Sequence, residues 1–147
     1  MFERLKSFFQ GPARKPVPLP ELDAKLAFGT LLVRVARADD TYLFEEISQI
    51  DRVLTRAFGL KPIAAAKMRA TCEKLAQTVT DDAKLASMIR ETMDYAHRID
   101  AVQAMWQVAE ADGITDEREA MLVHLIEEML GIETEDNEAA RAAAVIP

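Results

Sequence analysis

The two halves of this chain repeat one pattern of residues. The stretch VARADDTYLFEEI begins at residue 35 and VAEADGITDEREA begins at residue 108, a shift of 73 positions. Each copy holds a helical pattern, an Asp-containing break, a second helical pattern and a glycine stop, which is FGL at 58–60 and LGI at 130–132. Repeated units of this kind usually bury their apolar faces against one another. We therefore predict two halves related by a pseudo-two-fold axis in one shared core.

Apolar residues recur at helical spacing along both halves. The first stripe consists of Leu22, Leu26, Gly29, Val33 and Ala36. Gly29 stands among larger residues there, which predicts a close crossing with another helix. Half of the 147 residues are hydrophobic, only five are glycine, and no run alternates as a strand would. The fold class is therefore predicted to be all-α.

Glycine, proline and capping residues indicate where the helices begin and end. Gly59 and Gly131 each follow an apolar stripe, as glycine commonly does after a helix C-terminus. Pro62 suits the first position of a helix, which we expect to extend to about Thr78. After this helix, Thr80 or Asp81 can cap the next one.

The chain divides into three parts by composition. Residues 1–20 contain a short amphipathic segment and a proline-rich linker. Residues 21–133 form the helical domain, with halves at about 21–78 and 81–133. Residues 134–147 are an acidic C-terminal helix or tail. The length favours a single domain.

The first ten residues have an apolar face. Phe2, Leu5, Phe8 and Phe9 lie on one side of a helix built from MFERLKSFFQ. The following GPARKPVPLP holds four prolines in ten residues and predicts an extended linker. Such a segment either binds a membrane surface or a partner, or docks its phenylalanines on the helical body. The second interpretation is favoured.

The net charge argues against nucleic acid as a partner. The whole chain carries -7, whereas binding to phosphate is driven by Lys and Arg. Four basic residues against Glu3 leave +3 on residues 1–20, so the other 127 residues carry -10. The acidic character therefore belongs to the folded body.

Cysteine usage and hydropathy favour the cytoplasm. Cys72 is the single cysteine and forms no internal disulfide, and the first residues lack the apolar core of a signal peptide. No apolar run reaches the roughly 20 residues that span a bilayer. The expected localisation is cytoplasmic.

Four acidic residues at the two breaks form the candidate site. Asp39 and Asp112 follow helix C-termini, where the helix dipole makes a negative charge unfavourable. Seven residues on, Glu46 and Glu119 lie in the first turns of the next helices. An Asp and a Glu on either side of a tight turn can share a hard cation such as Ca²⁺ or Mg²⁺. This interpretation predicts a divalent-cation site.

A structural interpretation of the same acids stays open. Asp112 and Gly113 form a common turn dipeptide, and Asp116 with Glu119 matches a helix start in which the side chains cap the backbone. An EF-hand does not fit, because position 6 counted from Asp112 is Glu117 rather than glycine. On this interpretation the acids serve turns and caps without an ion.

Catalytic motifs are missing from the sequence. It holds no nucleophile elbow, phosphate loop or dinucleotide fingerprint. Cys72, His97 and His124 fall in separate helical segments, so we expect no zinc site. The chain is therefore predicted to be non-enzymatic, with a metal-dependent enzyme that uses the same acids as the less favoured alternative.

The two breaks carry a family resemblance. VARADDTYLFEE and VAEADGITDERE, each followed by an apolar helix that ends in FGL or LGI, resemble the TerB-like family of bacterial tellurite-resistance-associated proteins. The resemblance covers roughly residues 21 to 133. The same module occurs near the N-terminus of certain membrane-anchored DnaJ co-chaperones, but this chain has no His-Pro-Asp tripeptide of a J-domain.

The resemblance implies a fold, a site and a function class. The implied fold has about seven helices in two related halves, and the family's acidic, metal-binding positions fall on Asp39, Glu46, Asp112 and Glu119. Asp40 departs from the pattern where the family has glycine, so the second half is the stronger candidate for an ion. The implied function is a protein-interaction module in a stress-response or tellurite-resistance setting. A membrane-associated scaffold anchored by residues 1–10 is the alternative.

Overall fold

The computed structural model describes residues 22–145, and these residues form an all-α fold without strands. The expectations for residues 1–20 lie outside the described residues. The helices are α2 (Ala24–Arg37), α3 (Phe44–Phe58), α4 (Pro62–Thr78), α5 (Asp82–Thr92), α6 (Tyr95–Ala109), α7 (Glu117–Leu130) and α8 (Thr134–Val145). The predicted fold class is confirmed, with seven helices in the described part of the chain. None of these helices is long and apolar enough to cross a bilayer.

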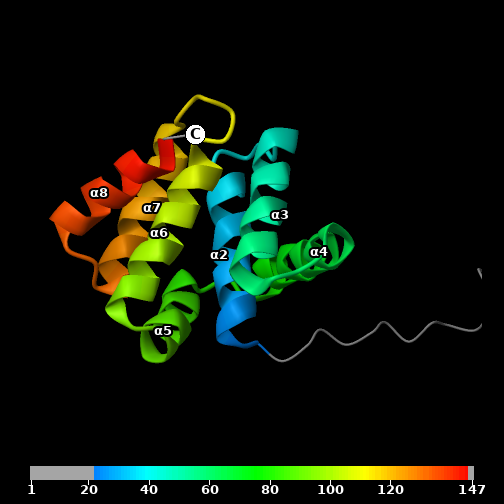
Figure 1. The fold of residues 1–147 in the computed structure, drawn as a ribbon, viewed down its shortest axis with the longest axis horizontal. Helices are drawn as coiled ribbons and strands as arrows, with labels where there is room; N and C mark the ends of the chain where they lie inside the picture. The colour runs from blue at the N-terminus through cyan, green and yellow to red at the C-terminus, as the bar shows by residue number, and fades with distance from the viewer. Residues whose placement is uncertain (1–21, 146–147) are drawn as a thin grey trace, which may run out of the picture.

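Helix α2 lies at the centre of the molecule. It contacts α3, α4, α5, α6 and α7, and Figure 1 shows it between α3 and α6. All residues from 27 to 33 are buried, so this helix is covered on every side. The sequence predicted a single buried stripe here. Burial extends around the whole helix because both halves pack against it.

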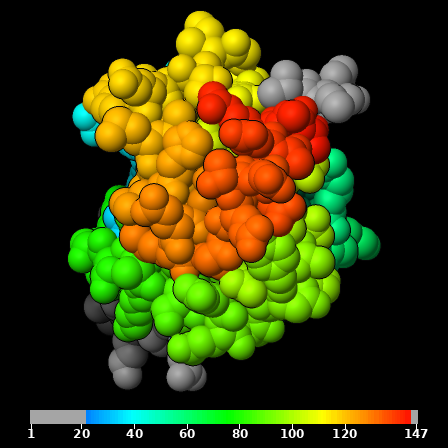
Figure 2. Space-filling view, turned by 90° about the vertical axis from the view of Figure 1, so that its left-hand side faces the viewer, coloured from blue at the N-terminus to red at the C-terminus, as the bar shows by residue number. Residues whose placement is uncertain are grey.

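The two halves use corresponding helices. Helix α4 packs chiefly on α2, and α8 packs chiefly on α6, so α2–α3–α4 corresponds to α6–α7–α8, with α5 as the connection. Figure 2 shows α8 lying over α6 and α7. The structural repeat therefore extends beyond residue 133, where the repeat in the sequence becomes too weak to follow.

The predicted helix ends are confirmed. Asp81 caps α5 by accepting a hydrogen bond from the Ala83 N–H, and Pro62 occupies the first turn of α4. Gly59 and Gly131 follow α3 and α7 in the left-handed region, at φ +61° and +69°. Glycine adopts this conformation without the steric cost that a side chain adds.

Gly29 marks the predicted close crossing, which is between α2 and α4. A Cβ atom at Gly29 would lie 2.5 Å from Sγ of Cys72. Both residues are fully buried. The absence of a side chain at Gly29 therefore lets the two helices approach each other.

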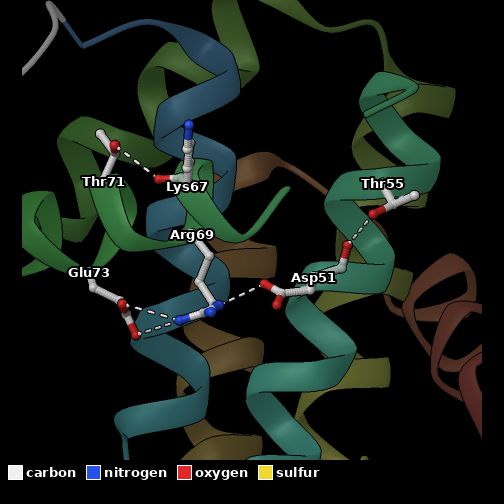
Figure 3. Close-up of polar contacts among 6 residues, drawn as sticks. All are labelled: Asp51, Thr55, Lys67, Arg69, Thr71 and Glu73. Carbon is white, nitrogen blue, oxygen red and sulfur yellow. Dashed lines mark hydrogen bonds and ion pairs between the residues drawn. The ribbon is translucent and has the colours of Figure 1, made fainter. Parts of the chain in front are cut away.

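Arg69 joins α4 to α3 (Figure 3). Its Nε lies 2.6 Å from Oδ1 of Asp51 on α3, and its Nη1 lies 3.3 Å from the carboxylate of Glu73 on α4. All three side chains are partly shielded from solvent. The guanidinium thus bridges two helices of the first half near its surface.

Trp106 anchors α8 to the core. Its ring is fully buried, and its Nε1–H donates to Oε1 of Glu127 and Oδ1 of Asn137, each at 3.1 Å. The Arg141 guanidinium lies 4.3 Å from the ring centroid. Burial raises the pKa of the Glu127 carboxyl, while the nearby His124 opposes that shift. The indole thus satisfies its N–H while fixing the last helix.

Candidate functional site

The two acidic breaks share one backbone conformation. Asp40 donates its N–H to the Arg37 carbonyl, and Gly113 donates its N–H to the Glu110 carbonyl, both at 3.0 Å. Both residues have positive φ, +63° for Asp40 and +81° for Gly113. Aspartate is among the few residues other than glycine that adopt the left-handed region readily. The departure at Asp40 therefore preserves the geometry of the first break.

The two break aspartates each close a turn with one carboxylate oxygen. Oδ1 of Asp39 accepts hydrogen bonds from the N–H and the hydroxyl of Thr41, at 3.0 and 2.7 Å. Oδ1 of Asp112 accepts a single hydrogen bond, from the Ile114 N–H at 3.0 Å. Both acids therefore shape turns, as the structural interpretation expected, and Asp112 is the less engaged of the two.

Arg118 brings the breaks side by side. This residue of α7 donates from Nη2 to the Asp39 carbonyl oxygen at 2.9 Å, and its Nη1 lies 3.5 Å from Oδ2 of Asp40. The contact crosses from the second half to the first. Figure 1 shows both breaks at the same end of the molecule. The acids of the two halves therefore surround one region.

Glu46 and Glu119 meet between the halves. Each occupies the third position of its helix, α3 or α7, and each residue is only 2% exposed. Each carboxyl group lies close enough to the other to change its pKa. Oε1 of Glu46 also accepts the Leu43 N–H at 3.0 Å, which caps the start of α3. The centre of the site is thus a buried pair of carboxyl groups.

Burial favours the protonated form of both carboxyl groups. Burial, the hydrogen bond with Glu46 and the charge of Glu46 raise the pKa of Glu119 to about 10, and Asp39 and Asp112 add to the rise. Burial also raises the pKa of Glu46. Two carboxylates so close together repel each other when both are ionised, so they retain a proton together.

The predicted site residues are arranged differently from the sequence expectation. The sequence pattern paired each Glu with the Asp of its own half, whereas the structure pairs Glu46 with Glu119 across the halves. Asp39 and Asp112 lie close enough to influence the pair electrostatically. Within residues 22–145, no three or more Asp, Glu, His or Cys side chains gather closely enough to hold an ion. The described arrangement is therefore a carboxyl pair with two flanking acids.

The other candidate ligands lie apart. Nδ1 of His97 is 2.6 Å from Asp94, and Nδ1 of His124 is 3.4 Å from Glu127. Cys72 is buried, and burial raises its pKa to about 11. Each histidine therefore pairs with an acid three residues away along the chain, and Cys72 is a buried thiol.

Sequence reasoning missed the role of Arg118. The equivalent position in the first half is Glu45, so the two copies carry opposite charges there. That difference was visible in the aligned repeat. Its meaning was hidden because the contact that it forms crosses between the halves.

A comparison with family models identifies the family of this chain. The model described as tellurite resistance protein TerB matches residues 25–142. The chain belongs to the TerB family. The match covers both breaks and most of α8, in agreement with a second half that continues past residue 133.

A solved structure has the same fold as this TerB protein. It is a protein of unknown function from Porphyromonas gingivalis W83, with 18% sequence identity and a TM-score of 0.60. The likeness covers 91% of this chain and 98% of that protein. No curated protein matches.

Proposed function

We propose that this TerB protein is a non-enzymatic, cytoplasmic interaction module whose acidic end binds a divalent cation. The observation that carries the proposal is the burial of Glu46 and Glu119 against each other. A buried carboxyl pair is costly unless a proton or a cation neutralises it. A divalent cation that displaces the shared proton would neutralise the two carboxylates of the pair and would offset part of the repulsion from the two flanking aspartates.

The donor chemistry fits a hard cation. All four acids offer carboxylate oxygens, which Ca²⁺ and Mg²⁺ prefer as ligands. Asp39 and Asp112 use Oδ1 for their turn hydrogen bonds, which leaves Oδ2 of each outside those bonds. Glu46 and Glu119 would hold the ion. The two aspartates flank the pair without joining it in this structure, so they would have to move onto the ion to complete the site. The cation would supply charge neutralisation and would tie the two halves together.

The interaction role rests on the family. Its description connects the chain with tellurite resistance, and from this we propose a stress-response setting with a protein partner. The acidic body is the surface offered to that partner. A metal-dependent enzyme is the weaker candidate, because no nucleophile or oxyanion-stabilising group accompanies the acids.

Thermal unfolding of chelator-treated protein tests the ion site. An ion that binds only the folded protein at 100 times its Kd adds about 2.7 kcal/mol, which moves the midpoint by several degrees for a domain of this size. We expect millimolar Ca²⁺, Mg²⁺, Mn²⁺ or Zn²⁺ to produce such a shift in the wild type. Glu119→Gln should remove it, because the variant loses a charged ligand.

The two aspartates provide a matched pair of variants. Asp112→Asn should abolish the ion-dependent shift, whereas Asp39→Asn should reduce it less. The physical reason is that Asp39 already accepts two hydrogen bonds and Asp112 accepts one. A midpoint that no ion changes, or an ion response unaltered in Asp112→Asn, would contradict the proposed site.

A further inference from the structure

A groove opens away from the acidic breaks. It lies among α2, α3 and α6, with a volume of about 490 Å³. Its apolar residues include Phe28 near the start of α2, Phe58 at the end of α3 and Met93 just before α6. The breaks lie at the opposite ends of α2 and α3 from Phe28 and Phe58, while the lining continues along α6 as far as Gln107. The groove is therefore separate from the carboxyl pair.

The groove has an apolar floor and a polar rim. Phe28 and Ala104 are nearly buried, and the rings of Phe28 and Phe58 meet edge to face at 6.1 Å between centroids. His97 and Asp100 stand exposed at the rim. The volume falls within the range of about 300–1,000 Å³ that is typical of ligand pockets. A groove of this kind suits aromatic and aliphatic side chains.

Residues 1–10 provide an occupant of matching chemistry. Phe2, Leu5, Phe8 and Phe9 share one face of a helical pattern. Residues 1–20 carry +3 and the other 127 residues carry -10, so long-range attraction favours contact between this segment and the helical body. Both the apolar face and the charge therefore complement the body.

The length of the connection permits the contact. Residues 11–21 link the segment to Leu22, and a proline-rich chain of that length spans roughly 34 Å at about 3.1 Å per residue. Phe28 lies four residues into α2, about 6 Å along the helix from Ala24. The groove thus begins close to the point where the connection joins the body.

We propose that residues 1–10 of the same chain dock their phenylalanines in the groove of α2, α3 and α6. The docked segment covers apolar surface that would otherwise face water. This inference is independent of the proposed cation site, because the two sites lie at opposite ends of α2.

Methionine methyl NMR on the full-length protein tests the docking. Met93 lines the groove, whereas Met121 on α7 is 64% exposed and serves as the internal control. In Phe8→Ser/Phe9→Ser, the Met93 methyl signal should shift because it loses the ring currents of the docked phenylalanines. The Met121 signal should stay in place. The matched variant Ser7→Ala/Gln10→Ala alters the polar face of the segment and should leave both signals unchanged.

Three outcomes would overturn the proposal. The first is an identical Met93 signal in the wild type and in Phe8→Ser/Phe9→Ser. The second is a Met93 shift that depends on protein concentration, which would assign the groove to a segment from a second copy. The third is binding of the wild type, but not the variant, to phosphatidylglycerol vesicles while the Met93 signal is unaffected by the substitution, which would assign the segment to membranes.

A second variant tests the groove itself. Ala57→Glu places a charged side chain at the rim and should reproduce the shift of the Met93 signal by blocking the groove.

Discussion

At the scale of single residues, position within a helix determines what each acid does. Glu46 and Glu119 are each the third residue of a helix. A negative charge at this position interacts favourably with the positive end of the helix dipole. Burial between the halves opposes that effect and raises the pKa of both groups. Desolvation outweighs the dipole because an exposed dipole contact contributes about 1 kcal/mol or less, whereas burying an unpaired charge costs several.

Glu119→Gln tests this balance through pH. The pKa of Glu119 is raised from 4.5 to about 10 in the folded protein, so its contribution to stability is full below about pH 4.5 and is lost as the pH rises toward 10. Glutamine cannot ionise. Without divalent ions at pH 8, the free energy of unfolding of the variant should therefore be higher than that of the wild type. We expect a difference of at least about 1.4 kcal/mol, the equivalent of one pKa unit.

Urea unfolding at pH 5 and pH 8 in chelator measures this difference. The control is Glu117→Gln, an exposed acid in the first turn of the same helix, which should leave the pH dependence unchanged. A Glu119→Gln variant that is less stable than the wild type at pH 8 would show that the ionised pair is satisfied by other groups.

At the scale of helices, local sequence signals determine where each helix begins and ends. Small residues determine how closely two helices approach each other. Asp81 begins α5, Gly59 follows α3 and Gly131 follows α7. Each signal acts within one turn of its own helix, so it can be read from the sequence. The approach of α2 to α4 at Gly29 depends on a second helix. The sequence predicted a close crossing at Gly29, but it did not show which helix crosses there.

Gly29→Ala should destabilise the protein, although alanine ordinarily favours a helix over glycine by roughly 0.5–1 kcal/mol. The added Cβ would lie 2.5 Å from Sγ of Cys72, and overpacking of a core typically costs about 1–3 kcal/mol. Cys72→Ala removes the opposing sulfur, so the double variant should recover part of the loss. The free energies of unfolding of the four proteins measure this coupling. Additive effects, or a Gly29→Ala variant as stable as the wild type, would contradict the close contact.

At the scale of the whole molecule, α2 joins the halves into one core. It contacts helices of both halves, including α3 and α4 of the first and α6 and α7 of the second. If the two halves separated, the apolar surface of α2 that both halves cover would be exposed to water. The acidic breaks meet at one end of this shared core, and the groove opens toward the other.

Unfolding should therefore be a single cooperative transition. Trp106 lies in the second half and reports on its core by fluorescence, while far-UV circular dichroism reports on the helices of both halves. We expect the two probes to give the same midpoint in urea, as two-state unfolding requires. Separate midpoints would show that the halves unfold independently. Glu127 or Asn137 should not be altered in this test, because both bind the indole.

The sequence by itself determined the helices, most of their ends, the duplication and the four acids at the breaks. These features depend on periodicity and on capping groups that act over a few residues. It also indicated the crossing at Gly29 from the size of one residue. The repeat was clear as far as Gly131 and faded in α8, whose correspondence with α4 appears only in their packing.

Only the tertiary structure decided which acids meet. Sequence spacing paired Asp39 with Glu46 and Asp112 with Glu119, because each pair flanks one turn. Packing of the halves instead opposes Glu46 to Glu119 and places Arg118 against the first break. Local signals carry no information about a neighbour more than 70 residues away. That information arises when both halves bury their apolar faces on α2 and thereby bring two helix starts together.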